Sequence, residues 1–401
     1  MSDQQPGLPA VLVCGALCCT APHPPCKDVG MRIRSPFPTA LVLAALLPMA
    51  ASAQDAASRT VPAAAPAEAI RDIDAVVVSG VVPGPGLWRV SRDGREMWVL
   101  GVLSPLPRRM EWEGRDVEAV VARASEVMLA PNVDVEADVG FFSGLALAPR
   151  LIGARRNPGD KRLEDLVPPA DYARWQALKA RYIGRDGGIE RWRPMFAALK
   201  LYVEAVEDVG LESEPDVADR VERMARTHGV TLSKPGVEVR IDDPKAAIEE
   251  FKQGRIDDLA CFTRTLDRLE TDLGMMRERA NAWAVGDIEG LRALPYTDQF
   301  EACRDAARSI EALRSRAGDI GGRLRAEWLR EAERALSANT TTLALLPMRE
   351  LLSDDGLVAA LRERGYRIES PDEIAAAAAA QEAVEVSAEP VEAAEAAATA
   401  D

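Results

Sequence analysis

Residues 87–107 read LWRVSRDGREMWVLGVLSPLP, and this stretch decides the fold. Two apolar runs, Leu87–Ser91 and Met97–Leu103, flank the polar residues Arg92-Asp93-Gly94-Arg95. An Asp-Gly pair between two such runs is typical of a tight β-hairpin, because both turn residues must adopt a positive φ. The second run is apolar on both faces of a strand, so we expect a central strand that is covered on both sides.

Segments near both ends of the chain predict the remainder of a sheet. We expect a helix over Arg115–Ser125 and a strand over Glu126–Leu129, which together make a βαβ beginning. Much later, Thr340–Pro347 is strand-like, Asp354–Arg364 has helical spacing and is expected to end at Gly365, and Tyr366–Ile368 is a last strand. The sequence therefore predicts an α/β (α+β) fold. Its split, mixed β-sheet is formed by N- and C-terminal βαβ-like halves that must meet in space.

Between these halves lies a large helical insertion, from about residue 136 to residue 336. Ser213 is expected as the N-cap of one of its helices, with Pro215 just inside, and Gly229 is expected to end that helix. Apolar residues recur at three- and four-residue spacing in four runs: Pro169–Tyr182, Ile189–Glu207, Val217–Thr227 and Ala246–Ala284.

The beginning of the chain has the pattern of an exported protein. Residues 31–53 combine a basic start, a short apolar run and the small residues Ala51-Ser52-Ala53, as in a Sec-type signal peptide. We expect cleavage after Ala53 and a periplasmic or secreted protein with no membrane span. The alternative is an unprocessed form that stays tethered to the membrane. We interpret residues 1–30 as translated from a start codon placed too early, and residues 54–86 as an Ala/Pro-rich linker.

Composition restricts the partners. The chain has 49 Lys and Arg against 64 Asp and Glu, a net charge of −15, which disfavours nucleic acid as a partner. Residues 371–401 contain no Lys or Arg and are rich in Ala and Glu, so we expect a disordered or transiently helical tail. Cys261 and Cys303 lie in separate predicted helices. In an oxidising compartment they could pair, and the alternative is two buried free thiols.

Several motifs in residues 87–370 resemble the TraB/GumN family, which is related to the TIKI metalloproteases and to the ChaN and erythromycin-esterase group. The hairpin is similar to the opening of that family. Ala282-Trp283-Ala284-Val285-Gly286-Asp287 is similar to its Ala-Trp-x-x-Gly-Asp helix end, and Asp355-Gly356-Leu357 and Arg364-Gly365-Tyr366 fit its C-terminal module. Leu324-Arg325 stands near the place of an Arg-Asn pair.

The positions that match the family's site carry other residues. The resemblance implies a His at the end of the Gly101-Val102-Leu103-Ser104 run, where Ser104 stands, and an acidic residue where Ala130 stands. It implies a second His at the place of Glu350. Relatives use a divalent metal, which needs several converging ligands, and the whole chain has only 2 His, His23 and His228. We therefore expect neither a metal nor another cofactor.

Other polar residues could form a site. Arg108, Arg109 and Trp112 follow the central strand and are candidates for binding an anionic or peptide ligand, although a solvated turn explains them too. Ser104 could be a nucleophile with His228 as its base, but a loop-capping hydroxyl and a helix-capping imidazole are the simpler interpretations.

A cation site and an aromatic groove have simpler explanations as well. Glu350 with Asp354 and Asp355 could bind a hard cation, whereas a helix N-terminus accounts for the two aspartates. Large aromatics dominate burial, so we expect several of the seven tryptophans in the core: Trp88, Trp98, Trp112, Trp175, Trp192, Trp283 and Trp328.

Three functional hypotheses follow. The first is a pseudo-hydrolase that binds a ligand or a partner through a family scaffold whose catalytic positions are substituted. The second is a divergent hydrolase or peptidase that uses Ser104 and Glu350. The third is an envelope-assembly or structural protein whose acidic tail docks a basic partner.

Overall fold

The predicted hairpin is present. The computed structural model describes residues 84–108, 110–137, 147, 150, 152–294, 299–311 and 318–381. Strands β1 (Leu87–Arg92) and β2 (Arg95–Val102) pair antiparallel around a turn in which Asp93 has φ 53° and Gly94 has φ 74°. This is the positive-φ turn that an Asp-Gly pair favours, and it fixes the register of the hairpin.

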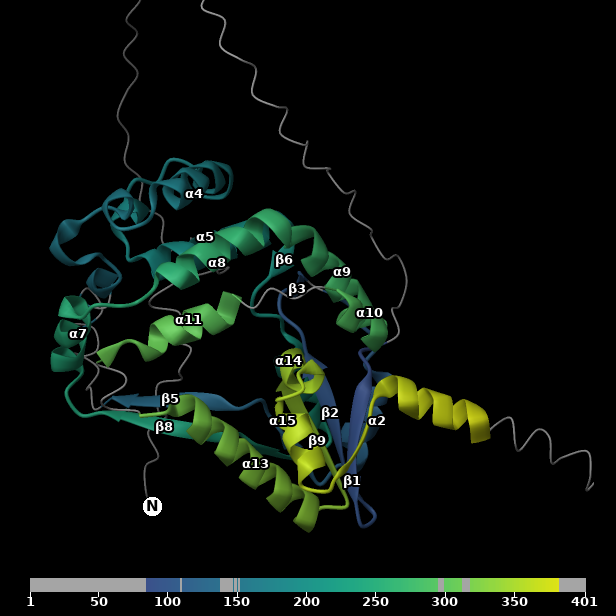
Figure 1. The fold of residues 1–401 in the computed structure, drawn as a ribbon. Coiled ribbons are helices and arrows are strands. Elements are labelled where there is room, and N and C mark those ends of the chain that lie inside the picture. Colours follow the sequence, from purple (N-terminus) through teal and green to yellow (C-terminus); the bar gives the residue numbers. More distant parts are fainter. Residues whose placement is uncertain are drawn as a thin grey trace, which may run out of the picture. The chain divides into compact units, whose positions relative to one another are not determined.

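The two halves of the sheet meet as predicted. The six-stranded sheet has the order β10-β1-β2-β9-β4-β7 (Figure 1). Strand β9 (Thr341–Pro347), from the far end of the chain, lies parallel to and between β2 and β4 (Glu126–Met128). Strand β10 (Arg367–Glu369) pairs antiparallel with β1. Strand β2 is therefore central, and six of the seven residues of β9 are buried.

The middle of the chain adds strands that the sequence did not predict. Strand β7 (Thr231–Ser233) is the sixth strand of the main sheet, parallel to β4. Strands β5 (Asn132–Ala137) and β8 (Gly236–Ile241) pair parallel as a separate ribbon, and β3 (Leu106–Pro107) pairs with β6 (Leu211–Glu212). Most of these strands are two or three residues long, too short to show a period of two.

The helical runs are largely where the spacing predicts them. Helices α4 (Pro169–Tyr182) and α6 (Val217–Thr227) have the expected bounds. The run over residues 246–284 is divided among three helices, and the run over residues 189–207 begins with a single 3₁₀ turn before its helix. The remaining helices are α2 (Arg115–Arg123), α5 (Pro194–Asp208), α7 (Pro244–Gln253), α8 (Leu259–Thr271), α9 (Leu273–Ala284), α10 (Ile288–Ala293), α11 (Gln299–Arg308), α13 (Ile320–Ala338), α14 (Met348–Leu352) and α15 (Leu357–Glu363), with 3₁₀ turns at Pro158–Asp160, Leu163–Asp165 and Ile189–Arg191.

Two predicted helix boundaries are wrong. Helix α6 has Asp216, not Ser213, as its N-cap, and no side chain caps it. Helix α15 begins at Leu357, so Asp354 and Asp355 precede it and are not in its first turn. The predicted C-terminal glycines are correct, because Gly229 (φ 67°) and Gly365 (φ 86°) adopt the left-handed conformation.

Beyond the last strand, residues 371–381 are helical. Ser370 and Glu373 form a reciprocal capping box, in which Glu373 accepts from the Ser370 amide at 2.7 Å and Ser370 accepts from the Glu373 amide at 3.3 Å. The first part of the predicted tail is therefore ordered as a capped helix. Residues 382–401 lie outside the described part, as do residues 1–83, which include the predicted signal peptide and most of the linker.

The apolar residues form two clusters. One surrounds the main sheet and includes Trp88, Trp112, Trp283 and Trp328, while the other joins α4, α5, α8 and α11 and includes Trp175 and Trp192. Six of the seven tryptophans are buried, as expected, and Trp98 is partly buried against the first cluster. In the helical cluster, Cys261 of α8 and Cys303 of α11 form a disulfide bond, which decides between the two alternatives for these cysteines. Within the described ranges, no helix is both long and apolar enough to cross a membrane.

Candidate functional site at the carboxyl edge of the sheet

The carboxyl ends of β2, β9, β4 and β7 lie at one edge of the sheet, because these four strands are parallel. In open α/β sheets this edge is where ligands usually bind. The loops that leave it carry all three positions of the predicted site: Ser104 follows β2, Ala130 follows β4, and Glu350 lies in α14 directly after β9. The structure thus brings the predicted positions to one edge.

Ser104 is used to fasten two loops together. Its hydroxyl donates a hydrogen bond to the backbone carbonyl of Ser213 at 2.5 Å, across 109 residues of sequence. This agrees with the expected loop-capping role. His228, the only histidine after the predicted signal peptide, has a different partner: its Nε2 lies 3.3 Å from the Glu118 carboxylate, between the end of α6 and α2.

Glu350 is also used by the backbone. One carboxylate oxygen accepts from the amide of Leu357, the first residue of α15, at 3.2 Å, and the other accepts from Nε of Arg349 at 3.2 Å. A carboxylate at the beginning of a helix satisfies an amide that has no partner within the helix and interacts favourably with the helix dipole. The role that the sequence assigns to Asp354 and Asp355 therefore belongs to Glu350. A hydrogen bond from Ser353 instead lowers the pKa of Asp355.

The residues at this edge do not fit a divalent metal. Ala130 has no ligand atom, the Ser104 proton is given to a carbonyl, and both oxygens of Glu350 already accept hydrogen bonds. Structural and catalytic metal sites need at least three ligand atoms that converge at bonding distance. In the described part of the chain, no group of three His, Cys, Asp or Glu is placed to hold a metal ion.

The motif residues that the chain retains have clear structural roles. The Trp283 indole donates to the Gly101 carbonyl of β2 at 2.6 Å, which anchors α9 to the central strand. Gly101 allows a close approach of α14, because a Cβ there would lie 2.5 Å from Met348 Cε and 2.7 Å from Leu351 Cδ1, and these side-chain ends would have to move. Asp287 accepts from the amide of Gly290 at 2.7 Å and so caps α10.

The C-terminal motif also preserves a close approach. A Cβ at Gly356 would lie 2.4 Å from the Glu350 carbonyl oxygen, so only glycine fits where the chain enters α15. The Gly356 carbonyl accepts from Arg325 of α13 at 3.3 Å. Arg325, near the place of the family's Arg-Asn pair, thus holds the loop that follows α14.

The three ligand-binding candidates do not share one environment. Trp112 is 3% exposed and packs edge-to-face against Trp283, with ring centroids 6.1 Å apart, so it belongs to the core. Arg220 covers the Trp112 ring at 4.2 Å. Arg108 forms an exposed ion pair with Glu207 at 3.2 Å, and Arg109 lies outside the described residues. Several tryptophans were expected in the core, but nothing in the sequence distinguished Trp112 as one of them.

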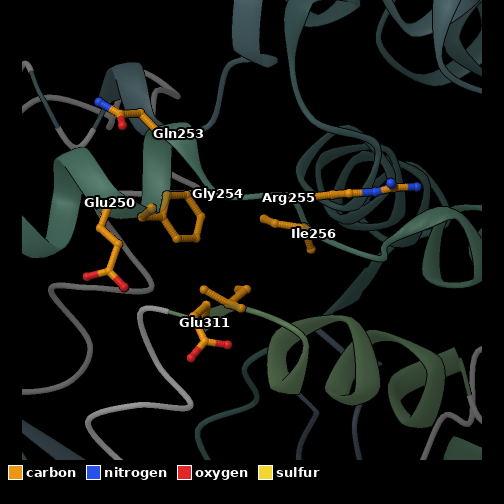
Figure 2. Close-up of a pocket in the computed structure, with 8 residues that line it drawn as sticks. Glu250, Gln253, Gly254, Arg255, Ile256 and Glu311 are labelled. Carbon is orange, nitrogen blue, oxygen red and sulfur yellow. The ribbon is translucent and has the colours of Figure 1, made fainter.

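The sequence also gave no indication of a cavity of about 310 Å³ between the end of α7 and the residues that follow α11. Figure 2 shows its lining, in which Arg255 extends away from the other labelled side chains. No position of the predicted site lines it. The lining residues are Glu250, Phe251, Gln253, Gly254, Arg255, Ile256, Ile310 and Glu311.

Residues 86–370 match the model of the TraB/PrgY/gumN family. The match covers the whole main sheet and the helices between its halves, so the chain belongs to this family. No curated protein and no solved structure matches the chain at a significant level.

Proposed function

We propose that this chain is a non-catalytic member of the TraB/PrgY/gumN family that binds a ligand or a protein partner outside the cytoplasm. One observation carries the proposal: at the carboxyl edge, the side chains of Ser104 and Glu350 bond to backbone groups of their own chain. The third position, Ala130, has no polar atom. The scaffold motifs of the family are retained, whereas its site positions serve the fold.

These bonds oppose each kind of catalysis in turn. A serine nucleophile needs a neighbouring base to take its proton, and the partner of the Ser104 hydroxyl is a carbonyl, which is not a base. A general acid or base must reach its substrate, and each oxygen of Glu350 already accepts a hydrogen bond from its own chain, from the Arg349 guanidinium and the Leu357 amide. A binding function requires none of these groups.

The cysteine pair supports export. A disulfide between Cys261 and Cys303 is stable in the periplasm or outside the cell and is rare in the reducing cytosol. It adds to the signal-peptide pattern of residues 31–53, which is independent of it. N-terminal sequencing of protein from the periplasmic fraction should give Gln54 as the first residue. An intact residue 31 at the N-terminus, or thiols that react before reduction, would contradict export.

The catalytic alternative is tested directly. Protein that begins at Gln54 is incubated with Mn²⁺, Co²⁺, Zn²⁺ or Ca²⁺, desalted, analysed for metal content and assayed for peptide and ester hydrolysis. We expect neither near-stoichiometric metal nor metal-dependent turnover. Turnover that disappears in Ser104→Ala or Glu350→Gln, with the fold intact, would replace our proposal by a divergent hydrolase. The matched control is Ser353→Ala, which removes a hydroxyl near the same edge.

A further inference from the structure

A two-stranded ribbon leads away from the main sheet at its carboxyl edge. It consists of β5 and β8, which follow β4 and β7 along the chain and pair parallel as those strands do (Figure 1). In the main sheet, the other side of β4 is covered by β9. Strand β9 ends at Pro347, where α14 begins, so it does not continue beside β5. Among the described residues, no strand pairs with this outer side of β5.

The backbone of β5 directs hydrogen-bonding groups to the open side. The Asn132 amide donates to the Pro235 carbonyl at 3.1 Å, so the backbone groups of Asn132 point toward β8. Successive residues of a strand direct their N–H and C=O groups to alternate sides, and those of Val133 and Val135 therefore point away from β8. An open strand edge of this kind is a template on which a further strand can pair.

One face of the ribbon is apolar, and it is better covered on β8 than on β5. The strand register places Val133 and Val135 of β5 beside Val237 and Val239 of β8. The two valines of β8 are 5% and 4% exposed, and helix α13 packs against this strand. The two valines of β5 are only half-buried. A strand added at the open edge would therefore remove more apolar surface from water.

The other face of the ribbon is acidic. Asp134, Glu136 and Glu238 are exposed there, and Arg240 is the only cation in the two strands. Arg240 lies on β8 and pairs with Glu136 and Glu238, each at 2.9 Å. The open edge itself carries Asp134 and Glu136. Side chains on directly paired residues of neighbouring strands lie about 5 Å apart, so a lysine or arginine of an added strand would lie close to these carboxylates.

A second copy of this chain does not suit the edge. Two β5 strands related by a two-fold axis normal to the sheet would pair antiparallel. In the registers that pair most of the strand, Asp134 then lies opposite itself or opposite Glu136. Like charges directly opposite each other destabilise a strand pair. The charge of the edge therefore favours a basic partner over self-association.

We infer that the outer edge of β5 binds an extended segment of a partner protein in which basic and apolar residues alternate. The backbone of this segment bonds to the N–H and C=O groups of Val133 and Val135. Its apolar residues extend the covered face, and its basic residues lie beside Asp134 and Glu136. The inference goes beyond the proposed function, because it holds whether or not the carboxyl edge is catalytic.

Binding is measured by isothermal titration of protein that begins at Gln54 with a short capped peptide of alternating lysine and valine. A peptide of the same composition, with its lysines and valines in two blocks, controls for attraction by charge alone, since as a strand it has no separate basic and apolar faces. Alternating peptides that are N-methylated at every second residue, in either phase, report on backbone pairing. We expect the alternating peptide to bind at least about tenfold more tightly than the block peptide, and only one N-methylated phase to lose binding.

The protein is varied at the same edge. Val135→Pro removes an amide that points away from β8, a position where strands tolerate proline, and Val135→Thr is the control that keeps the amide. Asp134→Asn/Glu136→Gln removes the charge, and Glu164→Gln/Asp305→Asn is its control at two exposed carboxylates elsewhere. We expect Val135→Pro and the charge variant each to weaken peptide binding by about tenfold or more, and both controls to bind as the parent does.

Three results would overturn the inference. The first is equal affinity of the parent for the alternating and block peptides, and the second is unchanged affinity in a folded Val135→Pro. If Val135→Pro does not fold, equal binding of the two N-methylated phases decides against the inference instead. The third is self-association of the parent that Val135→Pro abolishes, without peptide binding, which would identify a second copy as the occupant. These readouts do not depend on metal content or turnover, so they fail separately from the proposed function.

Discussion

At the carboxyl edge of the sheet, the polar side chains of Ser104 and Glu350 bond to the backbone of their own chain. At the hairpin end, arginines pair with a carboxylate or stack on an aromatic ring instead. Both ends belong to β2, so the same central strand supports both. At the edge where α/β folds usually bind ligands, these two side chains hold the backbone in place. Family membership and fold alone do not define a function, so each end of β2 needs its own test.

Among these tests, Trp283→Ala should have the largest effect on the stability of the fold. Trp283 is 1% exposed and its indole supplies the hydrogen bond to the Gly101 carbonyl. We expect the free energy of unfolding to fall by about 3–5 kcal/mol, as for other buried tryptophans, measured by chemical denaturation. Trp98→Ala is the control, because Trp98 is only partly buried on the sheet. If both variants lose the same free energy of unfolding, the hydrogen bond from Trp283 to β2 does not stabilise the fold more than other tryptophan contacts do.

A second test asks whether close packing at Gly101 is a requirement. Gly101→Ala should lower the free energy of unfolding by about 1–3 kcal/mol, since its new methyl group overlaps Met348 and Leu351. In a Met348→Ala background the same substitution should cost clearly less, because the nearest atom has been removed. A cost that is identical in both backgrounds would mean that the overlap is not what excludes a side chain.

A substitution at the carboxyl edge should change the free energy of unfolding less. Ser104→Ala should lower the free energy of unfolding by about 1 kcal/mol, because a partly buried loop carbonyl loses its donor. Ser213→Ala is the matched control: the acceptor is the Ser213 backbone, so this variant should stay within about 0.5 kcal/mol of the parent. If Ser104→Ala leaves stability unchanged, the hydroxyl is not structural, and the distinction between the two ends of β2 weakens.

The smallest expected effect is on the way the free energy of unfolding depends on pH below neutrality. Burial acts to raise the pKa of Glu126, but hydrogen bonds from Arg334 at 2.6 Å and Asn339 at 3.0 Å outweigh it, and the pKa lies below the ordinary value of 4.5. A lowered pKa contributes stability that is complete above the ordinary value and is lost as pH falls through the folded-state value.

Glu126→Gln should therefore reduce the free energy of unfolding at pH 7 and make it less dependent on pH in the acid range. Unfolding curves at pH 7 and at pH 3–4 check this. The control is Glu327→Gln, at a partly exposed carboxylate of α13 whose pKa is also lowered, by a hydrogen bond from Arg330. If the pH dependence of unfolding is unchanged in Glu126→Gln, the ionised Glu126 side chain does not contribute to the stability of the folded state.

Local patterns predicted the parts of the fold that depend on neighbouring residues. The Asp93-Gly94 turn, the bounds of α4 and α6 and the glycines that end α6 and α15 follow from the preferences of a few adjacent residues. Placing strands at both ends of the chain also predicted that they must share a sheet. Short strands such as β7 were not predicted. Three residues are too few to show the alternation of a strand, and β7 pairs only with a strand that is distant in the sequence.

The positions of the candidate site came from the resemblance to a family, which grouped Ser104, Ala130 and Glu350, and they do lie at one edge. The loop-capping role of Ser104 was expected from the sequence, whereas the role of Glu350 was not. That Glu350 rather than Asp354 or Asp355 begins α15 could not be predicted, because helix capping depends on where the helix starts to within one residue. Likewise, Trp112 turns into the core because Trp283 and Arg220 receive it.

The sequence by itself determined the hairpin and the split α/β architecture, because these depend on residue type and local order. Only the tertiary structure decided which backbone groups Ser104 and Glu350 contact. It also decided that Cys261 pairs with Cys303 and that Arg367 shares Glu369 with Arg89 of the hairpin. Such contacts join residues tens to hundreds of positions apart, and only the packing of the folded chain determines which distant side chains meet.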